Sequence, residues 1–327
     1  MTNAIFANAR ASALQASLLG AERLNRMADC ASGDDALKIL SEVNFGNGVS
    51  VASALEADLL IEAEERRYTV FVRETAPSEA LCRYLLAEYD YHNAEAIVRS
   101  KYLKTDCAPM LGADGFYRAD KMRDNIYADK YDLFPAPLSA ACREADALFL
   151  SGQANGQNIA ILFRRALYAD RAALSKKEKT LGKINRRKAD AANIAVALRA
   201  RNFAKTMKMR VEGGSLTDEN LRVLAAEPPE KIRENSRFSA LGKLIGAALD
   251  DFAEGRPLVG FERLADGAAL SSLKKERYEA EGVQPFVRYC FYKQAELSNV
   301  RIILSGLNNQ IEKNAVRARR SEEHTSE

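Results

Sequence analysis

The sequence predicts an all-α protein built of three similar helical bundles. Apolar residues recur at helical spacing along most of the chain, short Gly and Pro breaks separate these runs, and no run is a confident strand. A short motif also occurs three times: an acidic residue, then Asn three positions later, then an apolar helical run. The three copies are Asp90 and Asn93, Asp190 and Asn193, and Glu296 and Asn299. They lie roughly 100 residues apart, which indicates an internal repeat.

The apolar positions around the motif keep one register in all three copies. The positions nine before and eight after the acidic residue are Leu81, Leu181, Val287 and Val98, Leu198, Leu304. The first two copies continue with matched basic residues, whereas the third has Ser305 and Leu307 there. We therefore expect the third copy to have diverged or to dock differently.

Residues three apart share one face of a helix, so the acid and the amide of each motif can reach a common partner. The favoured interpretation is a polar position at a helix seam, where these groups satisfy backbone or side-chain donors. A ligand or metal site is the alternative. It is less favoured because two ligands without a third make a poor metal site.

A second pair of segments, starting at Gly115 and Gly214, follows the first and second motifs at nearly the same distance and is typical of a turn before a new helix. A chain of 327 residues exceeds one ordinary core. The predicted domains are residues 1–113, 114–213 and 214–319. The polar residues 320–327 resemble the translation of a sequencing-library adapter, so they are excluded as a non-native tail.

The first third should hold four helices. Leucines at near-helical spacing predict one helix over 8–27, and Ser32 is a candidate N-cap for a second over 36–43. Glycines near residue 47 break that helix before a third over 51–67. Residues 68–72 have strand propensity but no run to pair with, so we expect a helix end or loop there. Pro77 and the two residues after it open the first motif helix.

In the second third, helices are predicted over 138–148 and 158–174 and through the second motif. In the last third, capping residues near Thr217 open a helix that ends at Pro228 and Pro229. Further helices are expected over 237–254 and 266–280. The Gly282–Pro285 stretch then leads into the third motif helix.

The composition is typical of a soluble globular protein, with 47% hydrophobic and 28% charged residues. A net charge of +3 is mild for a nucleic-acid binder. Five scattered cysteines without a C-x-x-C pattern indicate reduced thiols. No apolar run is long enough to span a bilayer and no leader opens the chain, so we expect no membrane span.

The densest charge in the chain precedes the second motif. Seven cations and one acid, Glu178, lie within thirteen residues; the cations are Lys176, Lys177, Lys179, Lys183, Arg186, Arg187 and Lys188. The run lacks the interleaved aromatics that stacking on nucleic-acid bases needs. A solvated helix face is the favoured interpretation, and docking on an acidic protein or anionic headgroups is the alternative.

The sequence offers little catalytic chemistry. It has two histidines, so a Ser-His-Asp or Cys-His device would have to use His92, which lies on a motif helix. No phosphate-binding glycine loop is present. Asp250 and Asp251 could hold Mg²⁺ in an all-helical enzyme, but no second acidic cluster faces them, and a solvated helix end is favoured. No cofactor is expected.

Four stretches together resemble a known family: Asn8–Leu19, Asn93–Tyr102, Asp190–Arg199 and Lys293–Gly306. They are similar to the C subunit of V/A-type ATPases, the counterpart of the d subunit of the vacuolar enzyme. The resemblance extends to about Val316. It departs at Leu307, where the family usually keeps a basic residue, and at the C-terminal end.

The resemblance implies a funnel of three domains with pseudo-threefold symmetry and a non-catalytic rotor component. Such a component would link the central stalk, subunits D and F, to the membrane proteolipid ring, on the cytoplasmic side, during ATP-coupled transport of protons or sodium ions. We then expect no nucleic-acid partner. Two alternatives stay open: a Mg²⁺-dependent enzyme using Asp250 and Asp251, and a helical scaffold that binds protein or RNA through the basic run.

Overall fold

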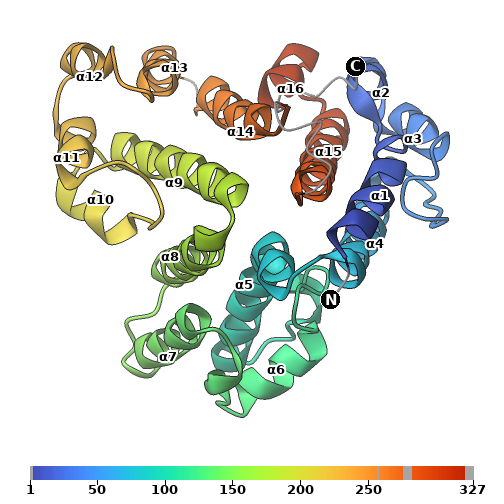
Figure 1. Ribbon diagram of the computed structural model, residues 1–327, viewed down its shortest axis with the longest axis horizontal. Coiled ribbons are helices and arrows are strands. Elements are labelled where there is room, and N and C mark those ends of the chain that lie inside the picture. The colour runs from blue at the N-terminus through green and yellow to red at the C-terminus, as the bar shows by residue number, and fades with distance from the viewer. Residues whose placement is uncertain (1–2, 256–257, 275–281, 321–327) are drawn as a thin grey trace. The chain divides into compact units, whose positions relative to one another are not determined.

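The computed structural model describes residues 3–255, 258–274 and 282–320, and every regular element in these ranges is a helix (Figure 1). The predicted all-α class is therefore confirmed. The chain forms two compact units. Unit 1 is Ser78–Leu221, and unit 2 joins Thr2–Pro77 to Arg222–Glu327. The division into three domains stays a prediction.

Unit 1 is organised around the first motif helix. Its α-helices are α5 (Glu79–Leu103), α6 (Ala119–Tyr127), α7 (Ala136–Leu150), α8 (Gly156–Leu174), α9 (Lys179–Ala200) and α10 (Phe203–Met209). Three 3-10 turns join them: η2 (Ala108–Met110), η3 (Tyr131–Leu133) and η4 (Ser175–Lys177). Helix α5 packs against α6, α7 and α8, and α8 packs against α7. The buried core between them includes Ile97, Ile126, Leu138 and Phe163.

Local sequence sets the ends of these helices. The predicted start of α5 is confirmed, because the Ser78 hydroxyl accepts a hydrogen bond from the Leu81 N–H at 3.2 Å. Asn155 and Asn158 form a reciprocal capping box at the start of α8. Lys104 ends α5 in the left-handed conformation, with φ of 54°.

Helices α5 and α8 run antiparallel. Near the start of α5, Arg83 pairs with Asp170 near the end of α8 at 3.4 Å. Near the end of α5, Arg99 donates a hydrogen bond to the carbonyl of Gly156, the first residue of α8, at 2.7 Å. Since α9 follows α8 after one short turn, α9 begins at the end of unit 1 where α5 also begins.

Unit 2 is organised around the third motif helix. Its first segment holds α1 (Ala4–Gln15), α2 (Gly20–Asp29), α3 (Gly33–Ser41), η1 (Ala54–Glu56) and α4 (Ala57–Thr75). Its second segment holds α12 (Pro229–Ser236), α13 (Gly242–Ala253), α14 (Val259–Lys274), α15 (Gln284–Asn308) and α16 (Lys313–Arg319). Helix α11 (Asp218–Ala226) crosses the boundary between the units. Helix α15 packs against α1, α2, α4, α14 and α16.

Two sequence predictions differ from the structure here. The single helix predicted over 8–27 is wrong, because α1 ends at Gln15 and α2 starts at Gly20, which has φ of +70°. Residues 68–72 lie inside α4, where Tyr68 and Phe71 are buried; Phe71 packs edge-on against Tyr289 of α15 at 5.1 Å between ring centroids. Of the helix predicted over 266–280, residues 275–280 lie outside the described part.

Candidate functional site

The three motifs lie in the interior of the three longest helices of the described chain, α5, α9 and α15. None of the six motif side chains is more than 4% exposed. A buried carboxylate needs compensating donors. The hydrogen-bond partners of each acidic side chain therefore show whether the motif is a polar position at a helix seam or part of a ligand site.

The first motif binds the loop that precedes α6. The two Asp90 carboxylate oxygens accept hydrogen bonds from the backbone N–H groups of Phe116 and Tyr117, at 3.1 and 3.0 Å. The Asn93 side chain accepts from the Gly112 N–H at 2.8 Å and donates to the Ala113 carbonyl at 3.1 Å. The acid and the amide thus hold two points of one loop.

The second motif repeats this arrangement on the loop that precedes α11. Oδ1 of Asp190 accepts from the backbone N–H groups of Ser215 and Leu216, at 2.6 and 3.1 Å, and Oδ2 accepts from the Ser215 hydroxyl at 2.7 Å. The Asn193 amide bonds both the N–H and the carbonyl of Val211, at 2.9 and 3.0 Å. The first and second motifs therefore make the same kind of contact, in which the acid and the amide bind the backbone of a loop that precedes a helix.

The glycines that mark the second sequence register explain how the loop approaches the acid so closely. A Cβ atom on Gly115 would lie 2.2 Å from Oδ1 of Asp90, and a Cβ atom on Gly214 would lie 2.5 Å from Oδ1 of Asp190. Each glycine directly precedes the donating N–H groups. Glycine is required there for close approach rather than for an unusual φ angle.

The third motif binds a segment at the other end of the chain. Oε2 of Glu296 accepts a hydrogen bond from the Leu19 N–H at 2.5 Å, directly before α2. The carboxylate therefore holds the start of α2 as Asp90 and Asp190 hold the approaches to α6 and α11. The third copy thus makes the same kind of contact, but to the N-terminal segment of the chain rather than to a loop that follows its own helix.

A buried ion cluster surrounds Glu296. The Lys293 ammonium lies 2.5 Å from Oε1 of Glu296 and 2.7 Å from Oε1 of Glu64 on α4. The other Glu64 oxygen accepts from the Gly46 N–H at 3.0 Å. These three side chains are almost fully buried, so the cluster fixes α15, α4 and two loops to one another.

Burial raises the pKa of Asp90 from 3.8 to about 7, although the two backbone hydrogen bonds favour the charged form. The nearby Asp170 carboxylate raises this pKa further, while the Arg83 guanidinium lowers it. The first loop contact is therefore sensitive to pH near neutrality.

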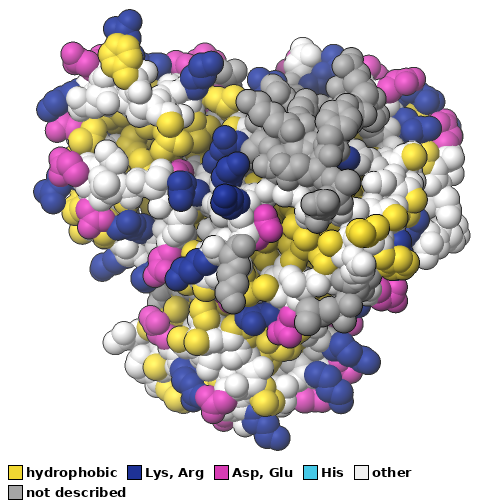
Figure 2. Space-filling model, in the orientation of Figure 1, with side chains coloured by type: hydrophobic (Ala, Val, Ile, Leu, Met, Phe, Trp, Pro, Cys, Tyr) yellow, Lys and Arg dark blue, Asp and Glu magenta, His cyan; other side chains and the backbone are white. Residues whose placement is uncertain are grey.

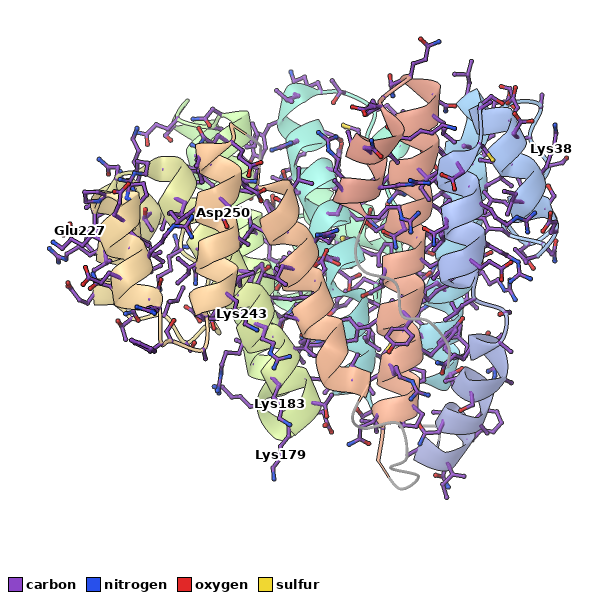
Figure 3. All side chains as sticks on the ribbon, turned by 90° about the horizontal axis from the view of Figure 1, so that it is seen from above. Lys38, Lys179, Lys183, Glu227, Lys243 and Asp250 are labelled. Carbon is purple, nitrogen blue, oxygen red and sulfur yellow. The ribbon has the colours of Figure 1, made fainter. Side chains whose placement is uncertain are left out.

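The basic run lies around the N-terminal end of α9. Lys176, Lys179, Lys183, Arg186 and Arg187 are exposed, Lys188 is half-buried, and the side chain of Lys177 lies outside the described residues. Lys179 and Lys183 both point away from the protein at this end of the helix (Figure 3). Within the same run, Leu181 and Ile184 are buried. The run is thus a charged outer face of a helix whose other face is core.

The two candidate Mg²⁺ ligands bind different partners. Asp250 pairs with Arg233 on α12. Asp251 is buried, and its carboxylate accepts a hydrogen bond from the Phe261 N–H at 2.8 Å in the first turn of α14. Asp251 therefore caps a helix, and the geometry does not favour the Mg²⁺-dependent enzyme.

A metal site, His92 and a membrane-spanning helix were the remaining features to locate in the structure. Over residues 3–255, 258–274 and 282–320, no group of three or more His, Cys, Asp and Glu is placed to hold a metal ion. His92 is exposed, and its Nε2 lies 3.0 Å from the Met110 carbonyl. Within the same ranges, no helix is long and apolar enough to cross a membrane.

Sequence reasoning found the six motif residues and the two glycines but missed Leu19, Glu64 and Lys293. A signal existed for Leu19, because Gly20 follows it inside an apolar periodic run. Glu64 and Lys293 carry no comparable signal, since an acid and a lysine on amphipathic helices are typical of a solvated face.

The fold and the motifs define an all-helical protein in which one carboxylate-to-backbone contact recurs. Residues 7–319 match the family described as ATP synthase (C/AC39) subunit, and the chain belongs to this family. It is also similar to the C subunit of the A-type ATP synthase of Haloferax volcanii, with 26% identity over 265 residues that cover 73% of each chain. The family resemblance inferred from the motifs is therefore confirmed.

Proposed function

We propose that the protein is a non-catalytic rotor adaptor of a V/A-type ATPase. It would link the central stalk, subunits D and F, to the membrane proteolipid ring and transmit torque during ATP-coupled transport of protons or sodium ions. As a peripheral component it would lie on the cytoplasmic face of the membrane. The observation that carries this proposal is the family match over residues 7–319.

The described geometry is consistent with a mechanical role. The motif carboxylates Asp90, Asp190 and Glu296 bind the backbone of loops between helices. Charge-assisted hydrogen bonds of this kind are about twice as strong as neutral ones. An adaptor under torque must resist shear between its helices, and buried bonds from a long helix to the next loop serve that purpose.

We further propose that the basic run at the start of α9 is a docking face for an acidic partner, as polar interfaces suit an assembly that must also come apart. Reversing the charge of Lys183, Arg186 and Arg187 to Glu should weaken assembly, and the loss should be larger at low salt than at high salt. Binding that stays the same at all salt concentrations would exclude this face.

The decisive experiment measures binding of the chain, ending at Arg319, to a purified D/F stalk and to a detergent-solubilised proteolipid ring. One chain per ring, bound to both partners at once, is the expected result. A folded, helical protein that binds neither partner would contradict the adaptor function.

The repeat also supports the predicted domains 1–113, 114–213 and 214–319, which we retain as a proposal. The first motif, in the first domain, holds the approach to α6 in the second. The second motif holds the approach to α11 in the third, and the third motif holds the start of α2 in the first. One type of contact would then join each domain to the next in a closed order.

A further inference from the structure

The first motif differs from the second in how the charge of its acid is compensated. The Asp90 carboxylate accepts from two backbone N–H groups of the first loop, which is defined as residues 104–118. The Asp190 carboxylate accepts from two backbone N–H groups and also from the Ser215 hydroxyl. At the position of Ser215 the first loop has Phe116, whose side chain has no hydrogen to donate. The first loop therefore compensates its buried acid less well than the loop before α11 does.

Charged groups from two helices face Asp90 in the buried seam between α5 and α8. Asp170 of α8 repels the Asp90 carboxylate, and Arg83 of α5 attracts it. Asp170 is itself 6% exposed and pairs with the Arg83 guanidinium at 3.4 Å. Two carboxylates thus share one guanidinium. Among these three groups, one negative charge has no counter-ion, at a place that water hardly reaches.

The other titratable groups nearby do not supply the missing positive charge. Burial raises the pKa of the Tyr91 and Tyr117 hydroxyls, so both stay neutral. His92 is exposed, and its Nε2 bonds a carbonyl group of the first loop rather than Asp90. The Asp114 carboxylate accepts from the first N–H group of α6. Of the described groups that face Asp90, none but a bound proton can balance its charge.

Acids at the surface of the protein do not have this constraint. Figure 2 shows carboxylates on the outside of the molecule, several of them beside lysines and arginines. Water and salt screen such charges, so their protonation has little effect on the fold. Asp90 is 4% exposed, so its protonation is coupled to whether its surroundings stay in place.

The backbone of the first loop is part of what keeps water away from Asp90. A Cβ atom on Gly115 would lie 2.2 Å from Oδ1 of Asp90, so the loop lies directly on the carboxylate. Burial is the largest cause of the raised pKa of Asp90. Movement of the loop away from α5 would admit water and relieve that cause. Opening of the loop and release of the proton are therefore linked.

We propose that the first loop is a proton-operated latch: protonated Asp90 keeps it closed on α5, and loss of the proton releases it. A neutral carboxyl group retains an acceptor oxygen for the loop and costs less to bury than a carboxylate. Because opening releases a proton, a rise in pH favours the open loop and acid locks it. The latch lies wholly within unit 1 and does not depend on the adaptor function.

The test measures amide hydrogen exchange in the chain ending at Arg319, from pH 5 to 8. The rates at Phe116 and Tyr117 are divided by those at Ser215 and Leu216, which also bind a motif carboxylate. This ratio removes the direct effect of hydroxide on exchange, which acts on every open amide. The ratio should rise by up to about tenfold per pH unit and level off above about pH 7.

Four variants assign the effect to its group. Asp90→Asn retains an acceptor oxygen but cannot titrate, so its ratio should not change with pH. Asp170→Asn removes the like charge, so its ratio should level off at a lower pH than that of wild type. The matched control is Asp124→Asn on α6, whose carboxylate is 56% exposed, and its ratio should follow wild type. His92→Gln retains a donor for the loop and should follow wild type as well.

A wild-type ratio that stays constant from pH 5 to 8 would overturn the inference. A rise that persists in Asp90→Asn would do the same, and a rise that disappears in His92→Gln would assign the latch to the histidine instead. If circular dichroism shows that Asp90→Asn does not fold, Asp170→Asn decides, because an unaltered levelling pH would then contradict the role of Asp90. Failure to bind the D/F stalk and the ring would refute the adaptor function alone.

Discussion

Replacing Asp190 by Ala removes the acceptor of three hydrogen bonds at once. The backbone N–H groups of Ser215 and Leu216 and the Ser215 hydroxyl all bind this carboxylate, at 2.6 to 3.1 Å. Leaving a buried donor unpaired costs about 1–3 kcal/mol. With two backbone donors affected and some relief by water, Asp190→Ala should lower the free energy of unfolding by about 3–5 kcal/mol.

Urea unfolding followed by far-ultraviolet circular dichroism measures this loss, since the midpoint should fall while the slope is unchanged. Asp190→Asn retains one acceptor oxygen, so its free energy of unfolding should fall by roughly half as much as that of Asp190→Ala. The control is Asp132→Ala, whose carboxylate is 91% exposed and pairs with Arg143 at 2.6 Å. An exposed pair contributes about 1 kcal/mol or less. If Asp190→Ala were no worse than this control, the motif would not be what holds the loop.

Three further predictions test the same contacts. Gly115→Ala should destabilise by about 1–3 kcal/mol because its Cβ would meet the Asp90 carboxylate, whereas Gly156→Ala, with no atom within 4 Å of its Cβ, should not. Burial raises the pKa of Asp90 to about 7 in the folded state, against an ordinary value of 3.8. Between these two pH values the folded state holds a proton that the unfolded state lacks. The free energy of unfolding should therefore fall as pH rises from about 4 to 7, by up to about 1.4 kcal/mol per pH unit. Asp90→Asn should lack this component in urea titrations at pH 5, 6, 7 and 8, and an unchanged slope would contradict the assignment. Glu296→Gln should speed amide exchange at Leu19 by about tenfold or more, because the acceptor loses its charge; unaltered exchange would show that Glu296 does not hold that segment.

The sequence was sufficient to predict the features that depend on a local pattern of residues. Helix α5 starts after Ser78, within the stretch that was predicted to open it, since a serine before an acidic first turn satisfies the same donors in any helix. The motif pairs and the glycines before their loops were found because they recur at fixed spacing. Their role at a helix seam follows from burial, which the apolar residues on either side already indicate.

Features that depend on distant residues could not be predicted in this way. The segment between α1 and α2 is bound by Glu296, 277 positions away, and Gly20 was the one local sign that the helix predicted over 8–27 would be interrupted. The role of Asp251 could not be predicted from the sequence for the same reason. Two adjacent carboxylates resemble ligands until their separate partners, Phe261 and Arg233, are known.

The contact between Glu296 and Leu19 also bears on how the chain folds during synthesis. Helices α1 to α4 emerge first, but their buried Glu64 lacks its lysine until residue 293 has been made. At about 5–20 residues per second, more than 200 residues of synthesis separate the two partners by roughly ten seconds or longer. Unit 1 is continuous in sequence and can complete its core in that interval. Helices α1 to α4 therefore reach their final structure only after the third motif helix has been made, and until then the buried faces that pack on α15 stay uncovered.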